Sequence, residues 1–187
     1  YLYGDNIPRA SRKEVLYLDD LIQFLEKTNP DLDDDDIRQI ADKVRLVGAD
    51  SDFATLHKVY GWMVDGLQYV TQKGEPRMIS LIDYTKVDDP GKPNNNIFRV
   101  VNQFTVDYIN NGALKNRRPD VLLYVNGMPV CVIELKNPAD ANATVYDAWE
   151  QINIRYWRDI PHLLHYCPLA CISDGVKTRL GTVRAPY

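Results

Sequence analysis

Residues 121–135 read VLLYVNGMPVCVIEL, and this stretch decides the fold. Two nearly continuous apolar runs, residues 121–125 and 130–135, are joined through Asn126-Gly127, a dipeptide typical of a β-hairpin. Strands that are apolar on both faces belong in the middle of a sheet, where both faces are covered. The stretch therefore predicts two neighbouring antiparallel strands at the centre of a sheet.

The segments on either side of the hairpin predict helices first, then strands, one helix and a last strand. Apolar residues at helical spacing and helix-capping side chains indicate the helices, and β-branched and aromatic runs indicate the strands. This order is typical of an α/β fold in which a mixed β-sheet is flanked by helices. The expected helices cover residues 18–28, 31–48, 51–67 and 144–158, and the expected further strands cover residues 78–84, 97–108 and 169–173.

The length and composition are those of a globular domain. The chain has 187 residues, of which 45% are hydrophobic and 26% are charged. At ~100–200 residues per domain, we expect one domain over residues 1–187, with a helical part to about residue 75 and a core from about residue 76. No apolar run approaches the ~20 residues that span a bilayer. Three cysteines and the lack of a basic-then-apolar leader favour the cytoplasm, and a first residue other than Met leads us to expect a fragment.

The charge is unevenly distributed along the chain. The net charge of −4 argues against binding of nucleic acid by bulk electrostatics, since phosphate binding relies on clustered Lys and Arg. Residues 1–93 carry 12 basic and 18 acidic side chains, whereas residues 94–187 carry 10 basic and 8 acidic ones. We therefore expect any surface that faces phosphates to lie in the second half.

Charged side chains stand at the ends of the two central strands. Asp120 begins the first strand, and Glu134 and Lys136 flank Leu135 at the end of the second strand, where residues two apart share a face. One explanation is a structural cluster in which Lys136 neutralises both carboxylates. The other is a Mg²⁺ site, because two carboxylates suit this ion, and the lysine would then orient water or stabilise negative charge.

The hairpin register constrains the metal-site explanation. A strict two-residue turn would pair Asp120 with Ile133, so Glu134 would point to the opposite side of the sheet. We therefore predict a three- or five-residue loop near Gly127, or a bulge near the strand end, that brings Asp120 across from Glu134. A regular two-residue turn without a bulge would argue against a metal site.

Pro119-Asp120 followed by Glu134-Leu135-Lys136 resembles the PD-(D/E)xK nuclease signature. The wider sequence is similar to the N-terminal nuclease region of type I restriction enzyme R subunits, and the close similarity covers about residues 97–187. It extends over the following segments: Val101-Asn102-Gln103-Phe104-Thr105-Val106, Arg118-Pro119-Asp120-Val121, Asn126-Gly127-Met128-Pro129, Ile133-Glu134-Leu135-Lys136-Asn137-Pro138, Arg158-Asp159-Ile160-Pro161 and Ile172-Ser173-Asp174-Gly175.

The resemblance implies a restriction-endonuclease-like fold and a type I site-specific deoxyribonuclease that cleaves DNA with Mg²⁺, for which Mn²⁺ could substitute. Asp120 and Glu134 would be the metal ligands, and Lys136 would be the catalytic lysine. Such subunits also contain an ATP-driven translocase and work with modification and specificity subunits. These residues contain no Gly-x-x-x-x-Gly-Lys-Ser/Thr loop, so ATP would act only through domains beyond this chain.

A Gln-x-x-x-Tyr motif supports nuclease function in this family, but the spacing differs here. Four residues separate Gln151 from Tyr156, which places them about 140° apart on a regular α-helix. A local π-bulge would bring them back to one face. Packing of the helix face is the alternative role for Tyr156.

Basic residues near this motif and the central strands are candidates for phosphate contacts, although each could equally be solvated surface charge. They are Lys115, Arg117, Arg118, Arg155 and Arg158. Two alternatives to a restriction nuclease remain open: a catalytically silent module on the same fold that docks DNA or partner subunits, and a nuclease that acts on repair intermediates or junctions.

Two other metal sites are less favoured by the sequence. The aspartate run within residues 31–36 lacks the ligand alternation of a calcium loop and suits a helix N-terminus instead. The series His162, His165, Cys167 and Cys171 contains zinc-compatible ligands without a familiar spacing, so we expect ordinary packing there.

Overall fold

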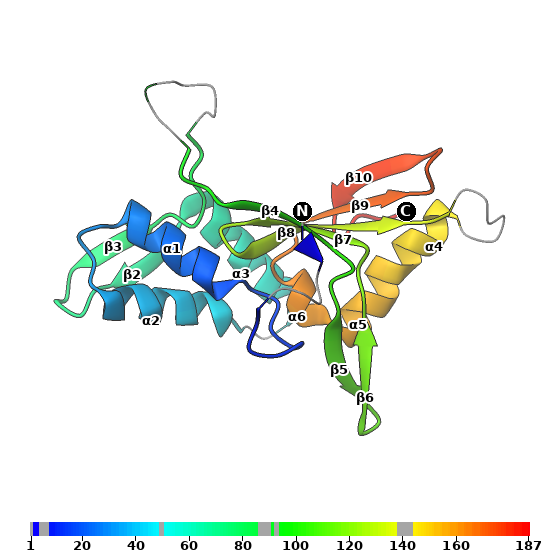
Figure 1. The fold of residues 1–187 in the computed structure, drawn as a ribbon, viewed down its shortest axis with the longest axis horizontal. Helices are drawn as coiled ribbons and strands as arrows, with labels where there is room; N and C mark the ends of the chain where they lie inside the picture. The colour runs from blue at the N-terminus through cyan, green and yellow to red at the C-terminus, as the bar shows by residue number, and fades with distance from the viewer. Residues whose placement is uncertain (1, 4–7, 49–50, 86–90, 92–93, 138–143) are drawn as a thin grey trace. The chain divides into compact units, whose positions relative to one another are not determined.

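A computed structural model describes residues 2–3, 8–48, 51–85, 91, 94–137 and 144–187 (Figure 1). The chain forms two compact units. The sheet unit comprises Tyr1–Val15, Arg99–Tyr124 and Pro129–Tyr187, and the helical unit comprises Leu16–Phe98 and Val125–Met128. Organisation as a single domain stays a prediction. Within the described ranges, no helix is long and apolar enough to cross a membrane.

The helical unit contains three helices and a small hairpin. Asp33 and Ser51 accept hydrogen bonds from backbone N–H groups at the starts of the second and third helices, as their sequence predicts. Gly66, with φ of 91°, ends the third helix, so the last residue expected there opens a strand instead. The elements are α1(Leu18–Thr28), α2(Asp34–Arg45), α3(Asp52–Asp65), β2(Leu67–Val70) and β3(Pro76–Ile79), and β3 covers only the beginning of the strand expected over 78–84.

The turn of the central hairpin belongs to the helical unit. It consists of Asn126 and Gly127 alone, with φ values of 51° and 77°, which are those of a type I′ turn. Only glycine fits at the second position, because a Cβ atom on Gly127 would lie 2.0 Å from the carbonyl oxygen of Tyr17. Asn126 is buried and donates a hydrogen bond to the carbonyl of Leu81. The predicted three- or five-residue loop is therefore wrong.

The main sheet confirms the predicted mixed α/β architecture. Among the described residues, six strands form it in the order β1-β4-β7-β8-β9-β10, with β8 and β9 parallel and β9 and β10 antiparallel. The hairpin strands β7 and β8 take the two central places. The strands are β1(Leu2–Tyr3), β4(Phe98–Asn102), β7(Val121–Val125), β8(Met128–Leu135), β9(Leu169–Ser173) and β10(Thr178–Thr182).

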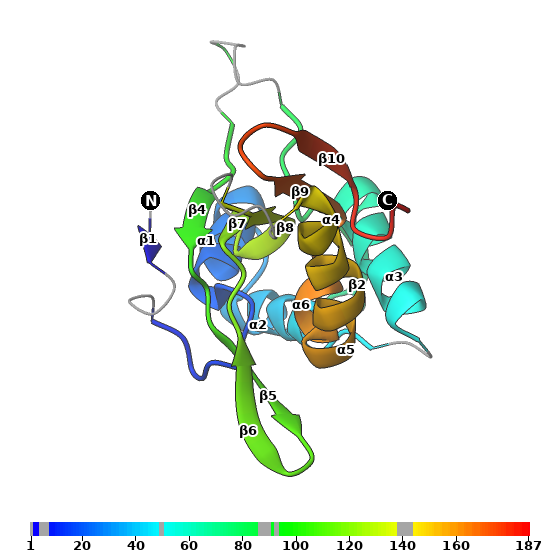
Figure 2. The same cartoon turned by 90° about the vertical axis from the view of Figure 1, so that its right-hand side faces the viewer.

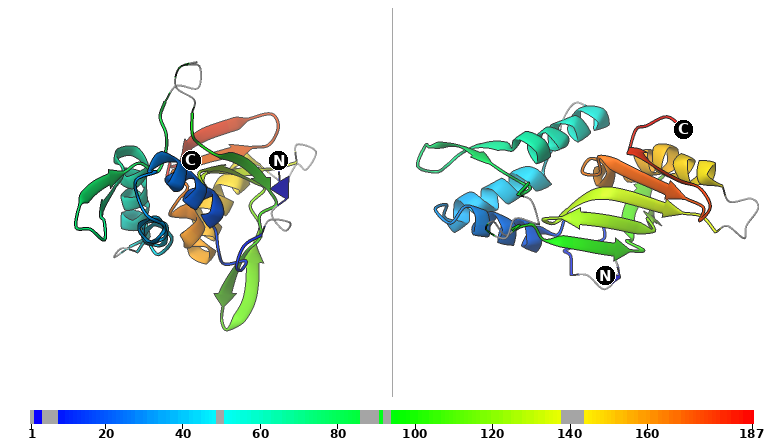
Figure 3. Two further views of the ribbon diagram at one scale, coloured as in Figure 1. Left: turned by 60° about the vertical axis from the view of Figure 1, so that its left-hand side comes forward. Right: turned by 90° about the horizontal axis from the view of Figure 1, so that it is seen from above.

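One helical stretch follows β8, where a helix over residues 144–158 was predicted. It contains α4(Val145–Glu150), the π-helical turn η2(Gln151–Tyr156) and α5(Trp157–Asp159), and α6(Pro161–Leu164) follows. Thr144 and Asp147 form a capping box at its start. The stretch runs beside the β9 end of the sheet (Figures 2 and 3), and α4 contacts β9.

A two-stranded arm leaves the sheet unit between β4 and β7. The predicted strand over residues 97–108 is broken, because Gln103 takes a left-handed backbone conformation with φ of 54°. Beyond the break, β5(Val106–Asn110) pairs with β6(Ala113–Arg117) in a sheet of its own. We call residues 106–117 the β5–β6 arm. The sequence did not predict β6 or β10.

Candidate active site

Glu134 lies near the end of the central strand β8 and is buried, with 1% of its surface exposed. It lies on β8 directly beside Ile172 of β9, on the buried face of the sheet. Both of its carboxylate oxygens accept hydrogen bonds from the helical stretch that follows. The Tyr156 hydroxyl donates to Oε1, and Gln151 Nε2 donates to Oε2 at 2.7 Å. The carboxyl group is thus held by two uncharged donors.

Asp120 approaches Glu134 although the turn contains only two residues. Asp120 precedes β7, so the strict alternation of the strand does not fix its side chain. Its Oδ2 accepts the backbone N–H of Leu135 at 2.8 Å, and its Oδ1 accepts Gln103 Nε2 at 3.0 Å. The two carboxyl groups are close enough for Asp120 to influence the pKa of Glu134 directly. Asp120 thus meets the end of β8 through its side chain, and the predicted bulge near the strand end stays a prediction.

Lys136 is linked to Glu134 through the side chain of Gln151. Its Nζ donates to Gln151 Oε1 at 2.6 Å, while the amide nitrogen of the same glutamine contacts Glu134. In the part of the chain that the structure describes, no ion pair within 4.0 Å joins Lys136 to Asp120 or Glu134. The direct ion-pair cluster considered for these residues is therefore not the observed arrangement.

Burial raises the pKa of Glu134 to about 8, and the neighbouring charge of Asp120 adds to this increase. The hydrogen bond from Tyr156 and the positive charge of Lys136 act in the opposite direction but do not cancel it. Burial and the adjacent Glu134 also raise the pKa of Tyr156, which remains a neutral donor. In the absence of a cation, Glu134 therefore binds a proton at neutral pH.

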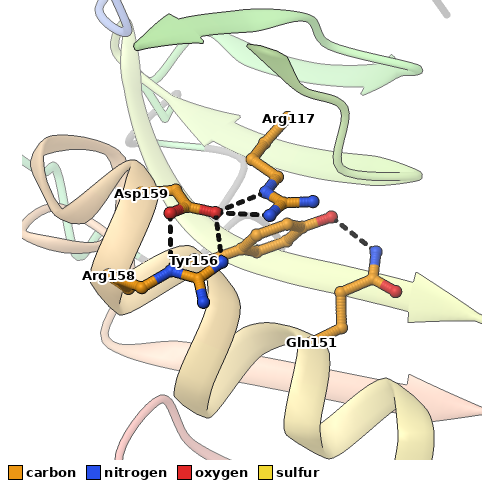
Figure 4. A network of polar contacts seen from close by, with 5 residues as sticks. All are labelled: Arg117, Gln151, Tyr156, Arg158 and Asp159. Atoms are coloured by element: carbon orange, nitrogen blue, oxygen red, sulfur yellow. Dashed lines mark hydrogen bonds and ion pairs between the residues drawn. The ribbon is translucent and has the colours of Figure 1, made fainter. Parts of the chain in front are cut away.

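The π-helical turn restores the geometry that the Gln151 to Tyr156 spacing seemed to break. In a π-helix, residues five apart take the relation that residues four apart have in an α-helix. Gln151 Nε2 lies 2.8 Å from the Tyr156 hydroxyl (Figure 4). Both side chains also donate hydrogen bonds to Glu134. The π-bulge considered from the sequence is present, and Tyr156 contributes polar contacts as well as packing.

A second buried carboxylate, Asp159, lies three residues beyond Tyr156 in the chain. Arg117 from the β5–β6 arm donates to its Oδ2 through Nε at 2.7 Å, and Arg158 donates through Nε to Oδ1 at 2.8 Å (Figure 4). These bonds lower the pKa of Asp159 to about 2, with the hydrogen bond from Arg158 as the largest cause. Two of the predicted phosphate contacts are therefore tied to one carboxylate.

The other predicted phosphate contacts are more accessible. Lys115 and Arg118 are exposed, and Arg155 forms a weak surface contact with Glu150 at 3.4 Å. The structure brings Arg117 and Arg158 together through Asp159. Their contact with DNA stays a prediction.

Sequence reasoning missed two polar side chains of this site, Gln103 and Asp159. Both lie in segments that carry the family resemblance, but nothing in the local pattern indicated their partners. The left-handed backbone of Gln103 places both its N–H group and its side chain on Asp120. Such a conformation is costly for a non-glycine residue and is often found at functional sites.

The donor set is compatible with a hard divalent cation. Asp120 and Glu134 supply adjacent carboxylate oxygens, and Mg²⁺ often binds through one or two carboxylates together with waters and substrate phosphates. Among the described residues, no group of three or more His, Cys, Asp or Glu side chains could hold an ion. This result also leaves the series from His162 to Cys171 without a zinc site in the described structure.

The fold and the site define a mixed α/β protein with a paired carboxyl and lysine site at the ends of adjacent central strands. The chain belongs to the family described as the type I restriction enzyme R protein N terminus (HSDR_N), whose profile matches residues 2–187.

Curated relatives agree with this assignment. The chain is 30% identical over 179 residues to the putative type I restriction enzyme MjaIXP endonuclease subunit of Methanocaldococcus jannaschii, with 93% of this chain and 16% of the relative covered. It is also 30% identical over 201 residues to the type I restriction enzyme HindI endonuclease subunit of Haemophilus influenzae, with 100% of this chain and 18% of the relative covered. The chain thus spans less than a fifth of these relatives.

Proposed function

We propose that this chain is the nuclease domain of a type I restriction R subunit, with a restriction-endonuclease-like fold, and that it hydrolyses DNA phosphodiesters in a Mg²⁺-dependent reaction. The observation that carries this proposal is the convergence of three residues at the end of β8: Gln151 joins Glu134 to Lys136, and Asp120 accepts the backbone N–H of the intervening Leu135. Residues far apart in sequence meet there in a buried, partly desolvated environment. Membership of the R protein family supports the same function.

Asp120 and Glu134 would hold the ion, and Mn²⁺ could take its place. When bound, the ion supplies positive charge at the phosphodiester oxygens and lowers the pKa of a coordinated water. Binding requires Glu134 to release its proton, since its pKa is raised to about 8 without a cation. The positive charge of a cation favours that release.

The other side chains of the site have separate roles in this proposal. Lys136 stabilises negative charge on the phosphate or orients the attacking water. Gln151 fixes the lysine relative to Glu134, because its amide contacts both side chains. Tyr156 and Gln103 orient the two carboxylates and exclude alternative rotamers.

The whole protein would need parts that lie outside this chain. We propose that a translocase driven by ATP, together with modification and specificity subunits, delivers the DNA in the cytoplasm. The net charge of −4 fits this division, because an acidic nuclease module that receives DNA from partners need not grip it alone.

One observation favours a second candidate function, a catalytically silent docking module. Both oxygens of Glu134 already accept protein hydrogen bonds, and the raised pKa keeps the group protonated at neutral pH. A site held in this state would preserve the fold without binding a metal ion. The two functions differ in their response to Mg²⁺.

The test uses the full-length subunit with its partner subunits and a circular duplex that carries the recognition site. We expect Mg²⁺-dependent cleavage that Lys136→Ala and Asp120→Asn each abolish, while the exposed control Lys177→Ala cleaves normally. Mg²⁺ should also raise the melting temperature of the wild type but not that of Asp120→Asn. Cleavage that persists in both site variants would contradict the proposal, and absence of both metal effects would favour the docking module.

A further inference from the structure

We propose that the β5–β6 arm enters the major groove of duplex DNA and holds the duplex beside the candidate active site. This inference rests on the proposed function, because it concerns how the same site receives its substrate. The arm is separate from the main sheet and ends in a free turn, as Figures 1 and 2 both show. A two-stranded β-ribbon of this kind fits the width of the major groove.

The arm is regular up to its tip. Five residues of each strand pair in sequence, from Val106 with Arg117 to Asn110 with Ala113. The tip is the turn Asn111-Gly112, with φ values of 49° and 75°, which again match a type I′ turn. At ~3.4 Å per residue, the five paired positions carry the tip roughly 17 Å from the base. This reach exceeds the ~8.5 Å depth of the major groove.

The base of the arm is anchored beside the candidate active site. Asp107 donates its backbone N–H to the carbonyl of Arg12 at 3.0 Å, and Arg117 is held by the buried Asp159. The Arg117 guanidinium also lies 5.7 Å from the centre of the Tyr108 ring. Only two residues separate the end of β6 at Arg117 from Asp120. The position of the arm is therefore coupled to that of the proposed metal ligand.

The side chains of the arm suit a nucleic acid. Arg117 is paired with Asp159, which leaves the exposed Lys115 and the adjacent Arg118 against the single acid Asp107, so this region stays basic in a chain of net charge −4. Phosphates on either side of a groove would complement that charge.

One cross-strand pair of the arm is apolar and exposed. Ile109 pairs with Leu114 across the strands, and these side chains are 56% and 65% exposed. Large apolar side chains on a free ribbon gain from burial. In a major groove they can contact thymine methyl groups. Lys115 follows Leu114 in the strand and points to the opposite face of the ribbon, where it can meet a phosphate beside the groove. Apolar contact on one face and positive charge on the other favour DNA over a protein surface as the partner.

A crosslinking experiment tests the placement directly. The full-length subunit, bound to duplex DNA in EDTA so that no cleavage is needed, would carry the photoreactive residue p-benzoylphenylalanine in place of Leu114. The matched control carries it in place of Val176, which is 83% exposed and lies in the turn between β9 and β10. We expect a DNA crosslink from position 114 at least tenfold above that from position 176. Equal crosslinking, or a crosslink to protein alone, would overturn the proposal.

A shortened arm provides an independent measurement. Deleting Ile109 and Asn110 together with Ala113 and Leu114 removes two cross-strand pairs. It leaves the Asn111-Gly112 turn between Tyr108 and Lys115. This variant, once shown to melt like the wild type, should bind duplex DNA at least tenfold more weakly in EDTA. Lys115→Gln should reduce the slope of log affinity against log salt by about 1.

The outcomes separate this inference from the proposed function. Normal binding by the shortened arm together with Mg²⁺-dependent cleavage would overturn the arm proposal and leave the nuclease intact. Arm-dependent binding in EDTA without any cleavage in Mg²⁺ would support the arm and overturn the nuclease.

Discussion

Two buried carboxyl groups in the sheet unit, Glu134 and Asp159, have opposite electrostatic states. Glu134 is held by uncharged donors and has a pKa raised to about 8, whereas Asp159 is held by two guanidinium groups and has a pKa lowered to about 2. Burial alone favours the neutral acid in both cases. Deep burial is the largest cause of the raised pKa of Glu134, whereas hydrogen bonds and positive charge from the two arginines outweigh burial at Asp159.

The two carboxyl groups differ in whether cations already neutralise them. Asp159 is neutralised by Arg117 and Arg158, so it stabilises the junction between the β5–β6 arm and α5. Glu134 and Asp120 lie together with no direct cationic partner among the described residues. Under the proposed function, a divalent ion would therefore bind at Glu134 and not at Asp159, whose charge is already neutralised.

The largest expected effect is on cleavage. Glu134→Gln should lower the Mg²⁺-dependent cleavage rate of the full-length subunit by at least about 100-fold, because the proposed metal loses a charged ligand. Asp159→Asn, measured at a temperature where it remains folded, should lower the rate less than tenfold. Equal losses in the two variants would remove the distinction between a metal site and a structural ion pair.

The second effect is on stability and should appear at the other carboxylate. Asp159→Asn should lower the free energy of unfolding by about 3 kcal/mol at pH 7, because it leaves two guanidinium groups beside a buried amide. The lowered pKa means that Asp159 stabilises the fold above its unfolded pKa near 4 and loses this contribution as the pH falls toward 2. Urea unfolding of wild type and variant should therefore converge in that acidic range.

The control for this prediction is Arg158→Gln, which removes one of the two cations and leaves Arg117 in place. We expect a smaller loss from it, because the Arg158 side chain is mostly exposed. A larger loss in Arg158→Gln than in Asp159→Asn would contradict the assigned role of the carboxylate.

The third effect is the opposite pH dependence at Glu134. Its folded-state pKa is raised, so the folded protein binds an extra proton between about pH 4.5 and about pH 8. Stability from this group is present at the acidic end and is lost as the pH rises through that window, by at most about 5 kcal/mol in metal-free buffer. Glu134→Gln should remove this loss, whereas the helix-surface control Glu150→Gln should retain it.

The smallest effect concerns the hydroxyl that holds Glu134. Tyr156→Phe should cost about 1 kcal/mol, since one buried hydrogen bond disappears. That bond lowers the pKa of Glu134, so its removal should shift the pH-dependent loss of stability to higher pH. The exposed control Tyr146→Phe should leave both quantities unchanged. A shift toward lower pH in Tyr156→Phe would contradict the assigned contact.

The sequence predicted the features that depend on near neighbours. The Asn126-Gly127 dipeptide predicted the hairpin, because these residues tolerate the two left-handed conformations of a type I′ turn. The caps at Asp33 and Ser51 and the buried strands β7, β8 and β9 were likewise predicted by local pattern. The charges at the strand ends singled out Asp120, Glu134 and Lys136, the family resemblance implied their roles, and the structure brings these three residues to one place.

Local pattern failed where a single backbone conformation changed the direction of the chain. Gln103 interrupts a segment whose sequence predicts one continuous strand. The energetic cost of its left-handed backbone is offset by contacts with Asp120, which lies 17 residues further along the chain. The same limitation applied to Asp120, whose side chain lies outside the alternation of β7. A register rule holds only for residues that are paired in the ladder.

The sequence by itself determined the central hairpin, the mixed α/β class and the membership in the type I R protein family, because turn chemistry, apolar periodicity and motif spacing are properties of consecutive residues. Tertiary structure alone decided that the π-helical turn aligns Gln151 with Tyr156, and that Asp159 joins Arg117 to Arg158. It also decided the protonation states of the two buried carboxyl groups. A pKa depends on burial and on charges brought together from distant segments, and the local sequence determines neither of them.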